Sequence, residues 1–345
     1  MGLSIAELVP KMELRFEDLN GKTLAIDAFN TLYQFLSTIR QPDGTPLQDA
    51  NGNVTSHLSG LFYRNMSLLL QGIKLVYVFD GEPPALKGAT HAIRKEARDE
   101  AREKYDAAKL AGDIAMMRKY SSSLARLNDA MLDESKELLE AMGVAIVQAP
   151  GEGEAEAAHL AKHSQYEIYA SASQDYDSLL FGAPKLIQNL TLARKRKTVS
   201  GYIEIHPELV ELEHVLNHLQ INLDQLICLG ILVGTDYNPG GIKGLGPKKA
   251  LAFVKQYQQP VLIFEAVHER MLAQEKQFDW QEIFHLFKKP NVTEAKLNFS
   301  KFDESKIKEI LCERHGFSEE RLESQFEKMR EFLKAKKQKG LKDWL

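Results

Sequence analysis

The sequence has few cysteines, few tryptophans and no long apolar run. Its two cysteines, Cys228 and Cys312, are far apart, so they give neither a zinc-binding spacing nor a disulfide framework. The longest apolar stretch, 226–234, is much shorter than the ~20 residues of a membrane-spanning helix. Glu7 and Lys11 interrupt the region where a signal peptide would be apolar. We therefore expect an intracellular protein in a reducing compartment, with no membrane partner.

The net charge of −4 over 345 residues conceals an uneven distribution. Hydrophobic residues make up 44% and charged residues 27%, a balance typical of a globular protein rather than a disordered one. The segment 84–126 carries ten Lys or Arg and six Asp or Glu, a net +4, so the remainder carries −8. A basic zone beside acidic zones keeps a nucleic-acid partner possible despite the negative total.

Short apolar runs alternate with amphipathic stretches of helix length. The runs 23–27, 75–80, 144–147 and 168–173 are rich in β-branched and aromatic residues and end in turns, which predicts strands. The stretches 56–70 and 132–141 predict helices. This alternation favours an α/β fold, with a mostly parallel central sheet flanked by helices.

Two further segments differ from this pattern. Residues 89–126 are rich in Ala, Lys, Arg and Glu but poor in large apolar residues, which predicts one or two helices projecting from the body. A glycine-rich turn from Tyr237 to Gly246 separates an apolar helix, 223–233, from a second helix that begins near Pro247. Alternatively, residues 89–126 could form an ordinary solvated surface helix, and the glycine-rich turn could be a simple connection between two helices.

Acidic residues stand where the predicted strands end. Asp27, Asp80 and Asp175 each occupy or follow the carboxyl end of a strand, and in an open parallel sheet these ends meet at the ligand-binding crevice. Like charges in one crevice oppose each other's ionisation unless cations neutralise them. Carboxylate oxygens without His or Cys favour Mg²⁺ or Mn²⁺ over zinc.

More acids are expected to join this group. Glu152 opens a helix after the third strand, and the spacing alone cannot decide whether Glu154 or Glu156 accompanies it. Asp177 lies two residues beyond Asp175, and Asp236 precedes the glycine-rich turn. Two divalent ions ~4 Å apart could activate water and stabilise the leaving oxygen in phosphoryl transfer.

Three other functions explain less of the sequence. The segment from Asp27 to Thr31 faintly echoes phosphatases that form an aspartyl-phosphate, but Phe29 replaces their second acid, so we discount that chemistry. A small-molecule phosphohydrolase would have no use for the basic projecting segment, 89–126, or for the glycine-rich turn and the lysines beside it. A non-enzymatic binder of DNA structures that recruits a sliding clamp would leave the acids unexplained.

Five motifs in collinear order resemble the flap endonucleases, the structure-specific 5′ nucleases of replication and repair, most closely the archaeal branch. They are Ala25-Ile-Asp27, Val76–Pro84, Ala149–Ala155, Ser173–Asp177 and Gly234–Gly246. The resemblance implies hydrolysis of DNA phosphodiesters near junctions of single strand and duplex, leaving 5′-phosphates, with possible 5′–3′ exonuclease activity, in Okazaki fragment maturation and repair.

The resemblance also implies the ligands of two Mg²⁺ ions, for which Mn²⁺ could substitute. These are Asp27, Asp80, Glu152, Glu154, Asp175, Asp177 and Asp236, so Glu154 is implied and Glu156 is not. By position, Lys87 and Arg94 match basic residues that contact the scissile phosphate. Tyr33 matches an aromatic that stacks on a nucleobase near the cut, although it could simply pack.

DNA contacts outside the acid group are implied as well. Residues 85–126 match the family's helical gateway and cap, and 223–260 include its helix-two-turn-helix, where a monovalent cation could also bind. The phosphate-contacting residues there would be Lys243, Gly244, Gly246, Lys248 and Lys249. Thr55 and Arg321 match residues of a pocket for a one-nucleotide 3′ flap.

The end of the sequence resembles a sliding-clamp motif. Gln338, Leu341, Trp344 and Leu345 fit the pattern Gln-x-x-aliphatic-x-x-aromatic-aromatic, with Leu345 in place of the last aromatic. We expect a nuclease core over 1–333 and a clamp-binding tail over 334–345. The implied protein is a monomer that binds branched DNA in an archaeal-like cytoplasm beside the nucleoid, or in the nucleus of a eukaryote.

Overall fold

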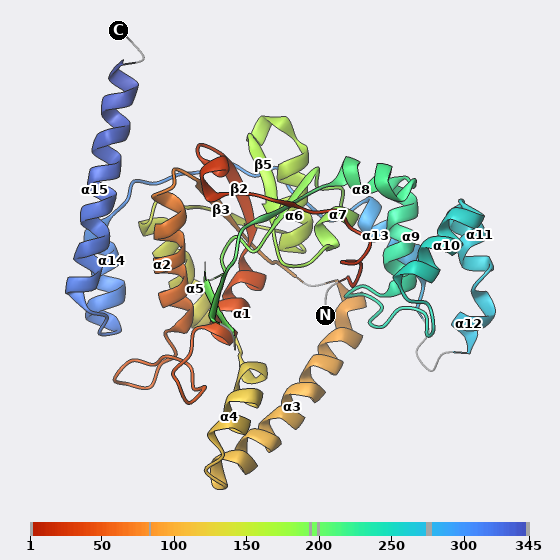
Figure 1. The fold of residues 1–345 in the computed structure, drawn as a ribbon, viewed down its shortest axis with the longest axis horizontal. Helices are drawn as coiled ribbons and strands as arrows, with labels where there is room; N and C mark the ends of the chain where they lie inside the picture. The colour runs from red at the N-terminus through yellow and green to blue at the C-terminus, as the bar shows by residue number, and fades with distance from the viewer. Residues whose placement is uncertain (1–2, 83, 193–194, 199–200, 274–277, 343–345) are drawn as a thin grey trace.

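A computed structural model describes residues 3–342 except 83, 193–194, 199–200 and 274–277. Its centre is a seven-stranded sheet in the order β1-β9-β6-β5-β2-β3-β4 (Figure 1). These strands are β1 (Met12–Glu13), β2 (Thr23–Asp27), β3 (Lys74–Phe79), β4 (Ala145–Gln148), β5 (Ile168–Ala172), β6 (Lys185–Gln188) and β9 (Glu208–Glu211). The pairs from β4 to β6 are parallel, and β9 is antiparallel to both β6 and β1. The predicted mostly parallel sheet is confirmed.

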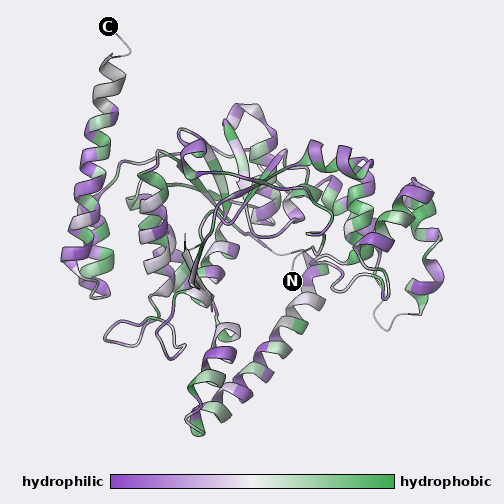
Figure 2. Ribbon diagram, viewed as in Figure 1, coloured by the Kyte–Doolittle hydropathy of each residue, from purple (hydrophilic) through white to green (hydrophobic). Residues whose placement is uncertain are grey.

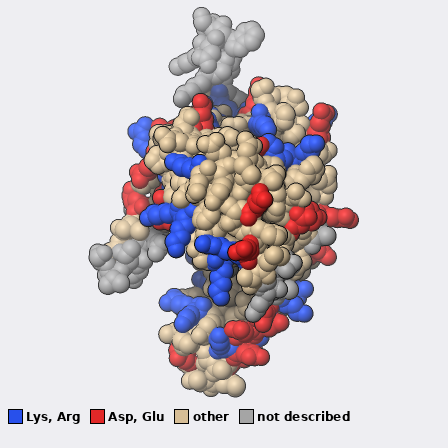
Figure 3. Space-filling model, turned by 90° about the vertical axis from the view of Figure 1, so that its right-hand side faces the viewer, with Lys and Arg blue, Asp and Glu red and all other residues tan. Residues whose placement is uncertain are grey.

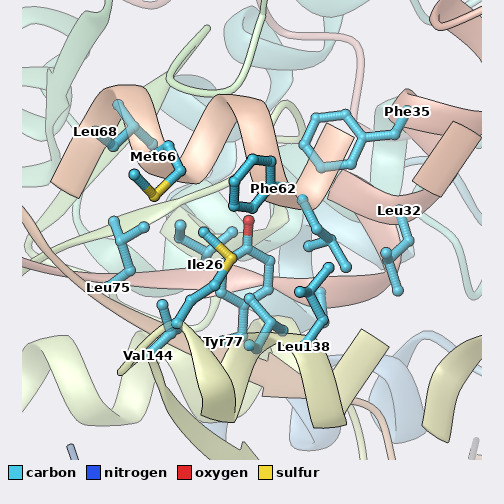
Figure 4. Close-up of a cluster of buried hydrophobic side chains, with 14 of the residues drawn as sticks. Ile26, Leu32, Phe35, Phe62, Met66, Leu68, Leu75, Tyr77, Leu138 and Val144 are labelled. Atoms are coloured by element: carbon cyan, nitrogen blue, oxygen red, sulfur yellow. The ribbon is translucent and has the colours of Figure 1, made fainter. Parts of the chain in front are cut away.

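Alternate residues of the central strands face two different cores. Leu75 and Tyr77 of β3 point to the layer of α1 (Ala28–Thr38), α2 (Ser56–Leu69) and α5 (Asp129–Ala141). Figure 4 shows Phe62 and Met66 of α2 packed against this face. The buried Tyr77 hydroxyl donates to Asn65 Oδ1 at 2.9 Å, which satisfies its hydrogen-bonding capacity in an apolar layer.

The opposite face of the sheet carries smaller side chains. Val76 and Val78 of β3 meet Ala157 and Leu160 of α6 (Gly153–Lys162) in a second cluster. Small alanines let this helix lie close to the strands. The amino end of α6 is thereby held beside the carboxyl ends of β3 and β4.

A third cluster joins the sheet edge to a group of helices. Apolar α9 (Leu223–Val233) is buried at its centre, and Figure 2 shows this region as strongly hydrophobic. Around it lie α7 (Asp177–Leu180), α8 (Leu212–Leu219), α10 (Pro247–Tyr257), α11 (Pro260–Glu265), α12 (His268–Leu272) and α13 (Trp280–Lys288). Among the described residues no single helix has the length and hydropathy of a membrane span. Helices α8 and α9 have that length and hydropathy only when they are taken together, and they are bent by 80° relative to each other.

Two helices project from the body as an arch (Figure 1). They are α3 (Gly88–Leu110) and α4 (Ile114–Ser121), which pack on each other and leave Leu110 and Ile114 exposed at the tip. The arch leaves the body after the short helix η2 (Ala85–Lys87) and returns through η3 (Ser122–Leu124). The projecting helices predicted from composition are thus present.

The remaining elements lie at the periphery. They are η1 (Phe16–Leu19), η4 (Ser164–Tyr166), a hairpin of β7 (Lys195–Thr198) and β8 (Gly201–Glu204), α14 (Glu304–Lys308), the π-helical η5 (Glu309–Arg314) and α15 (Glu319–Lys342). The last helix packs Leu322 and Phe326 into the core beside α2 and then extends away from the body (Figure 1). It continues to Lys342, so the segment expected to be a tail from residue 334 begins as helix.

Candidate active site

The acids identified from the sequence lie on the segments that leave the parallel strands. Asp27 ends β2 and caps α1, and Asp80 follows β3 directly. Glu152 caps α6 after β4, while Asp175 and Asp177 follow β5. Because β2, β3, β4 and β5 are parallel neighbours, these segments all leave the same edge of the sheet.

A single residue, Asn30, connects the acids of β2 and β5. Asn30 donates its backbone N–H to Asp27 Oδ1 and its side-chain Nδ2 to Asp175 Oδ2, both at 3.0 Å. The first bond is an ordinary helix cap. The second joins residues 145 positions apart and fixes the separation of two acids of the site.

The amino end of α6 is fixed to the end of β3. The backbone N–H of Gly153 donates to Asp80 Oδ1 at 2.6 Å. A Cβ at position 153 would lie 2.7 Å from that same oxygen, so only glycine permits this approach. The contact aims the first turn of α6, which carries Glu152 and Glu154, at Asp80.

The position of Glu154 settles which acid of α6 accompanies Glu152. Glu154 Oε1 accepts from both the backbone N–H and the hydroxyl of Ser178, at 3.0 and 2.8 Å, and interacts electrostatically with Asp177. Glu156 is buried elsewhere, where its Oε2 accepts from the Thr293 N–H at 2.9 Å. Glu154 therefore belongs to the group, and Glu156 anchors the segment after α13.

Lys87 lies among the acids at the base of the arch. Its Nζ is 2.7 Å from Glu152 Oε1 and 4.0 Å from Asp236 Oδ2, with 18% of the side chain exposed. Thr90, one turn into α3, donates its hydroxyl to the backbone oxygen of Asp236. These contacts join the arch to the turn that follows α9.

Crowding and burial oppose ionisation of several of these acids. Burial, with repulsion from Asp80 and Asp175, raises the pKa of Asp27 to about 8. Burial and repulsion from Asp236 raise the pKa of Asp177 to about 8 as well, and the pKa of Glu154 is raised well above its ordinary value by burial and the Asp177 charge. One lysine cannot neutralise seven carboxyls, so the site favours additional cations.

The donor set fits divalent metal ions. All seven candidate ligands offer carboxylate oxygens, the donors that Mg²⁺ prefers. Asp177 Oδ1 is buried and accepts no hydrogen bond within the described part of the chain, which leaves it free to ligate. Among the described residues no three acids are already close enough to enclose an ion, so binding would draw the carboxylates together.

Lys87 and Arg94 are the two residues predicted to contact the scissile phosphate. Burial alone would lower the pKa of Lys87, but Glu152, Asp236 and Asp80 raise it above its ordinary value, so the ammonium stays charged. Arg94 occupies the second turn of α3, and its side chain lies outside the described residues. Figure 3 shows Lys and Arg side chains on the flank where the arch meets the body and on the arch itself, mixed there with acids.

Tyr33 is available for contact with DNA. It lies on α1, six residues after Asp27, and is 38% exposed. The ring is exposed enough to stack on a base, and that role stays a prediction.

The glycine-rich segment between α9 and α10 forms the two turns expected of it. Gly241 has a φ of +56°, and a Cβ there would lie 2.3 Å from the carbonyl carbon of Val233. Ile242 and Leu245 are buried beneath the turns. The predicted phosphate contacts all lie exposed on the outside: Lys243, Gly244, Gly246, Lys248 and Lys249.

A cavity lies beside Arg321, one of the two residues predicted to form a 3′-flap pocket. A pocket of about 610 Å³ is lined by Arg321, Tyr63 and four further residues of the 318–325 region. Thr55 is 4% exposed at the start of α2, where its N–H donates to the Leu47 oxygen, and it is not among the residues that line this cavity. The role of Thr55 beside Arg321 stays a prediction.

The clamp motif falls largely outside the described residues. The backbone of Gln338 and Leu341 is helical within α15, but their side chains are not described. Trp344 and Leu345 lie beyond the described chain. Their role stays a prediction.

Sequence reasoning missed the residues that hold the acids in place. Asn30 has a weak signal, since it stands three positions after an acid that caps a helix. Ser178 and Thr90 have none, because their partners are 24 and 146 positions away. Only the folded chain brings them together.

Comparison with known proteins gives consistent results. The XPG N-terminal domain model matches residues 3–101, and the XPG I-region model matches residues 143–236. Flap endonuclease 1 of Pyrococcus abyssi is 50% identical over 346 residues, covering 100% of this chain and 98% of its own length. The Thermococcus onnurineus enzyme is 49% identical, with 100% and 99% covered.

Solved structures give the same picture. The flap endonuclease-1 structure from Methanococcus jannaschii matches with a TM-score of 0.75 and 37% identity, covering 97% of this chain and 100% of its own. The catalytic core of Rad2 in complex with DNA substrate has the same fold, with a TM-score of 0.69 and 23% identity, and 96% and 100% covered. With half of its residues identical to curated relatives over its whole length, and with its acids on the segments leaving the parallel strands, this chain belongs to the flap endonuclease family of structure-specific nucleases.

Proposed function

We propose that the seven acids, Lys87 and Arg94 form the centre that cuts DNA at the junction of a duplex and a 5′ single-stranded flap. Hydrolysis of DNA by a structure-specific nuclease follows from the family. The observation that carries the residue assignment is the set of buried acids gathered around Lys87 at the foot of the arch. The product would be a 5′-phosphate and a 3′-hydroxyl.

Asp27, Asp80, Glu152, Glu154, Asp175, Asp177 and Asp236 would hold the divalent ions that nucleases of this family generally use. We propose two Mg²⁺ ions, replaceable by Mn²⁺. When bound, such a pair supplies an activated water and stabilises the leaving oxygen. Asn30, Ser178 and the Gly153 N–H keep three of these acids oriented.

Lys87 would stabilise negative charge that develops on the scissile phosphate. Its ammonium is already at the acid group, within an ion pair that a phosphate can replace. Tyr33 would stack on a base beside the cut, a contact worth about 1–3 kcal/mol. The arch, 85–126, would enclose the flap.

The duplex would lie on the helix-two-turn-helix. The exposed lysines there and the amino end of α10 offer positive charge and free N–H groups to the phosphates. A monovalent cation could bind the same turns. The pocket beside Arg321 is the candidate site for a one-nucleotide 3′ flap.

We further propose a monomer that binds the replication sliding clamp through Gln338, Leu341, Trp344 and Leu345. Trp344 and Leu341 would be the apolar anchors. By analogy with the archaeal relatives, it would act in the cytoplasm beside the nucleoid.

The direct test is cleavage of matched 5′-flap, nicked and single-stranded DNA with and without Mg²⁺. Asp80→Ala and Asp175→Ala should each lower single-turnover cleavage at least about a hundredfold, because each removes a carboxylate that positions charge at the reaction centre. DNA affinity should change little. Asp224→Asn, an exposed acid paired with Lys288 on the surface, is the matched control and should cut normally. Full activity in either site variant would contradict the assignment.

A further inference from the structure

Tyr237 is a buried aromatic residue at the acid group to which the proposed mechanism gives no role. It directly follows Asp236 and is only 4% exposed. Its ring packs edge-on against Phe287 of α13, with centroids 5.3 Å apart and an interplanar angle of 75°. Phe287 in turn contacts Phe181, at 4.8 Å, so a row of three rings supports this side of the site.

The face of the Tyr237 ring supports the catalytic lysine. Lys87 Nζ lies 5.7 Å from the ring centroid, within the range of a cation–π contact. The same ammonium is 2.7 Å from Glu152 Oε1. Lys87 is therefore held between an aromatic face and a carboxylate.

The hydroxyl of Tyr237 has an unusual position. It is buried beside the Glu152 carboxylate, whose Oε1 also receives the Lys87 ammonium at 2.7 Å. Burial, with the charges of Glu152, Asp177 and Glu154, keeps the pKa of the phenol far above its ordinary value. The phenol is thus a neutral donor next to the Glu152 carboxylate.

Lys87 cannot neutralise Glu152 and a scissile phosphate at the same time. When the ammonium turns to DNA, Glu152 loses a donor that orients it, and a carboxylate that is to hold a metal ion needs another hydrogen bond to fix its direction. Of the side chains beside Glu152, Tyr237 carries a neutral hydroxyl that can donate to the carboxylate after the ammonium leaves.

We propose that Tyr237 is a positioning residue that serves the two states of Lys87. In the DNA-free protein its ring supports the lysine against Glu152. When Lys87 moves to the phosphate, the Tyr237 hydroxyl donates to Glu152 and keeps that carboxylate directed at the site. This inference rests on the proposed function, in which Lys87 contacts the scissile phosphate.

Two substitutions at Tyr237 separate its ring from its hydroxyl. Tyr237→Phe keeps the ring, so Lys87 should stay as unreactive toward an acetylating reagent as in the wild type, measured by mass spectrometry on metal-free, DNA-free protein. Single-turnover cleavage at saturating flap DNA should fall about tenfold or more, since a hydrogen bond to a charged group is lost. Half-maximal cleavage should also require more Mg²⁺, with DNA affinity measured without metal unchanged.

Tyr237→Leu removes the ring as well. It should increase acetylation of Lys87 severalfold and slow cleavage further than Tyr237→Phe. Phe287→Leu is the control for packing: it should lower the melting temperature but leave both the Mg²⁺ requirement and Lys87 reactivity near those of the wild type.

Either of two results would overturn the inference. One is a Tyr237→Phe enzyme with the wild-type rate and Mg²⁺ requirement. The other is a Tyr237→Leu protein whose Lys87 reacts as slowly as in the wild type. Failure of the proposed function looks different, because wild-type protein would then not cut flap DNA with Mg²⁺ at all.

Discussion

Individual side chains around the acids fix their directions. Asn30 is the clearest case, because one residue bonds the segment leaving β2 to the segment leaving β5. Mutually repelling carboxylates move apart unless a donor holds them. Precise placement of such groups contributes strongly to catalysis, so small displacements should be costly.

We therefore predict that Asn30→Ala slows cleavage about tenfold or more while DNA affinity is kept, because Asp175 loses its donor but no basic residue is removed. Single-turnover rates and equilibrium binding measured side by side check this. Asn20→Ala, which removes an exposed amide donor to the Gln71 oxygen, is the control. Wild-type cleavage by Asn30→Ala would mean that Asp175 is positioned by other contacts.

A second residue-scale feature lies far from the acids. His315 contacts Asp49 Oδ2 through Nδ1 and Glu134 Oε1 through Nε2, both at 2.9 Å. Two carboxylates can only accept, so this arrangement needs the doubly protonated imidazolium. Although burial opposes it, these two partners raise the pKa of His315 above its usual value.

A base whose pKa is raised by folding stabilises the protein below its unfolded pKa of ~6.5, and that contribution is lost as the pH rises through the folded pKa. His315→Gln should accordingly lower the melting temperature most below pH ~6.5, with a smaller effect as the pH rises above that value. Buried His57 acts in the opposite sense: burial and the His315 charge lower its pKa to about 4, so it destabilises the fold as the pH falls from ~6.5 toward 4. The melting temperatures of variant and wild type are compared at each pH, and a difference that does not vary with pH would refute the imidazolium bridge.

At the scale of elements, the terminal helix extends from packed core to projecting end. Phe326 of α15 is buried against Phe62 and Phe302, whereas Leu333 is already 41% exposed. The helix then continues along a basic, polar sequence to Lys342. By Leu333, therefore, the helix has passed from the core to the protein surface.

We predict that deleting 338–345 abolishes binding to the sliding clamp but leaves clamp-free cleavage unchanged, because the anchors are removed and the core is not. Binding measured with purified clamp, and cleavage measured with and without it, check both parts. A double variant, Lys334→Ala with Lys336→Ala, removes nearby charge without touching the motif and should still bind. Clamp binding retained after the deletion would place the interaction elsewhere.

At the scale of the whole molecule, the sequence predicted the sheet because its apolar runs are short, β-rich and end in acids. The antiparallel edge was missed, since Lys185–Gln188 and Glu208–Glu211 are four-residue strands with polar or charged residues at their ends. Within the site, the acids themselves carry the signal. The choice between Glu154 and Glu156, the burial of Thr55 and the contacts of Asn30 depend on long-range packing, which local spacing does not encode.

Acids collect at the carboxyl edge of the parallel strands, while exposed lysines occupy the turns before α10. The arch carries side chains of both signs. A polyanion can therefore bind along the basic surfaces and reach the acids only where cations neutralise them. The total charge of −4 gave no hint of this.

The measurement that tests the central claim most directly is anomalous diffraction from crystals of the protein grown or soaked with Mn²⁺. We predict two ions within the group formed by Asp27, Asp80, Glu152, Glu154, Asp175, Asp177 and Asp236, with carboxylates drawn toward them. Crystals of Asp175→Ala should lose at least one ion. Fully ordered acids with no manganese among them at saturating Mn²⁺ would contradict the claim that these carboxylates form a metal-dependent cutting centre.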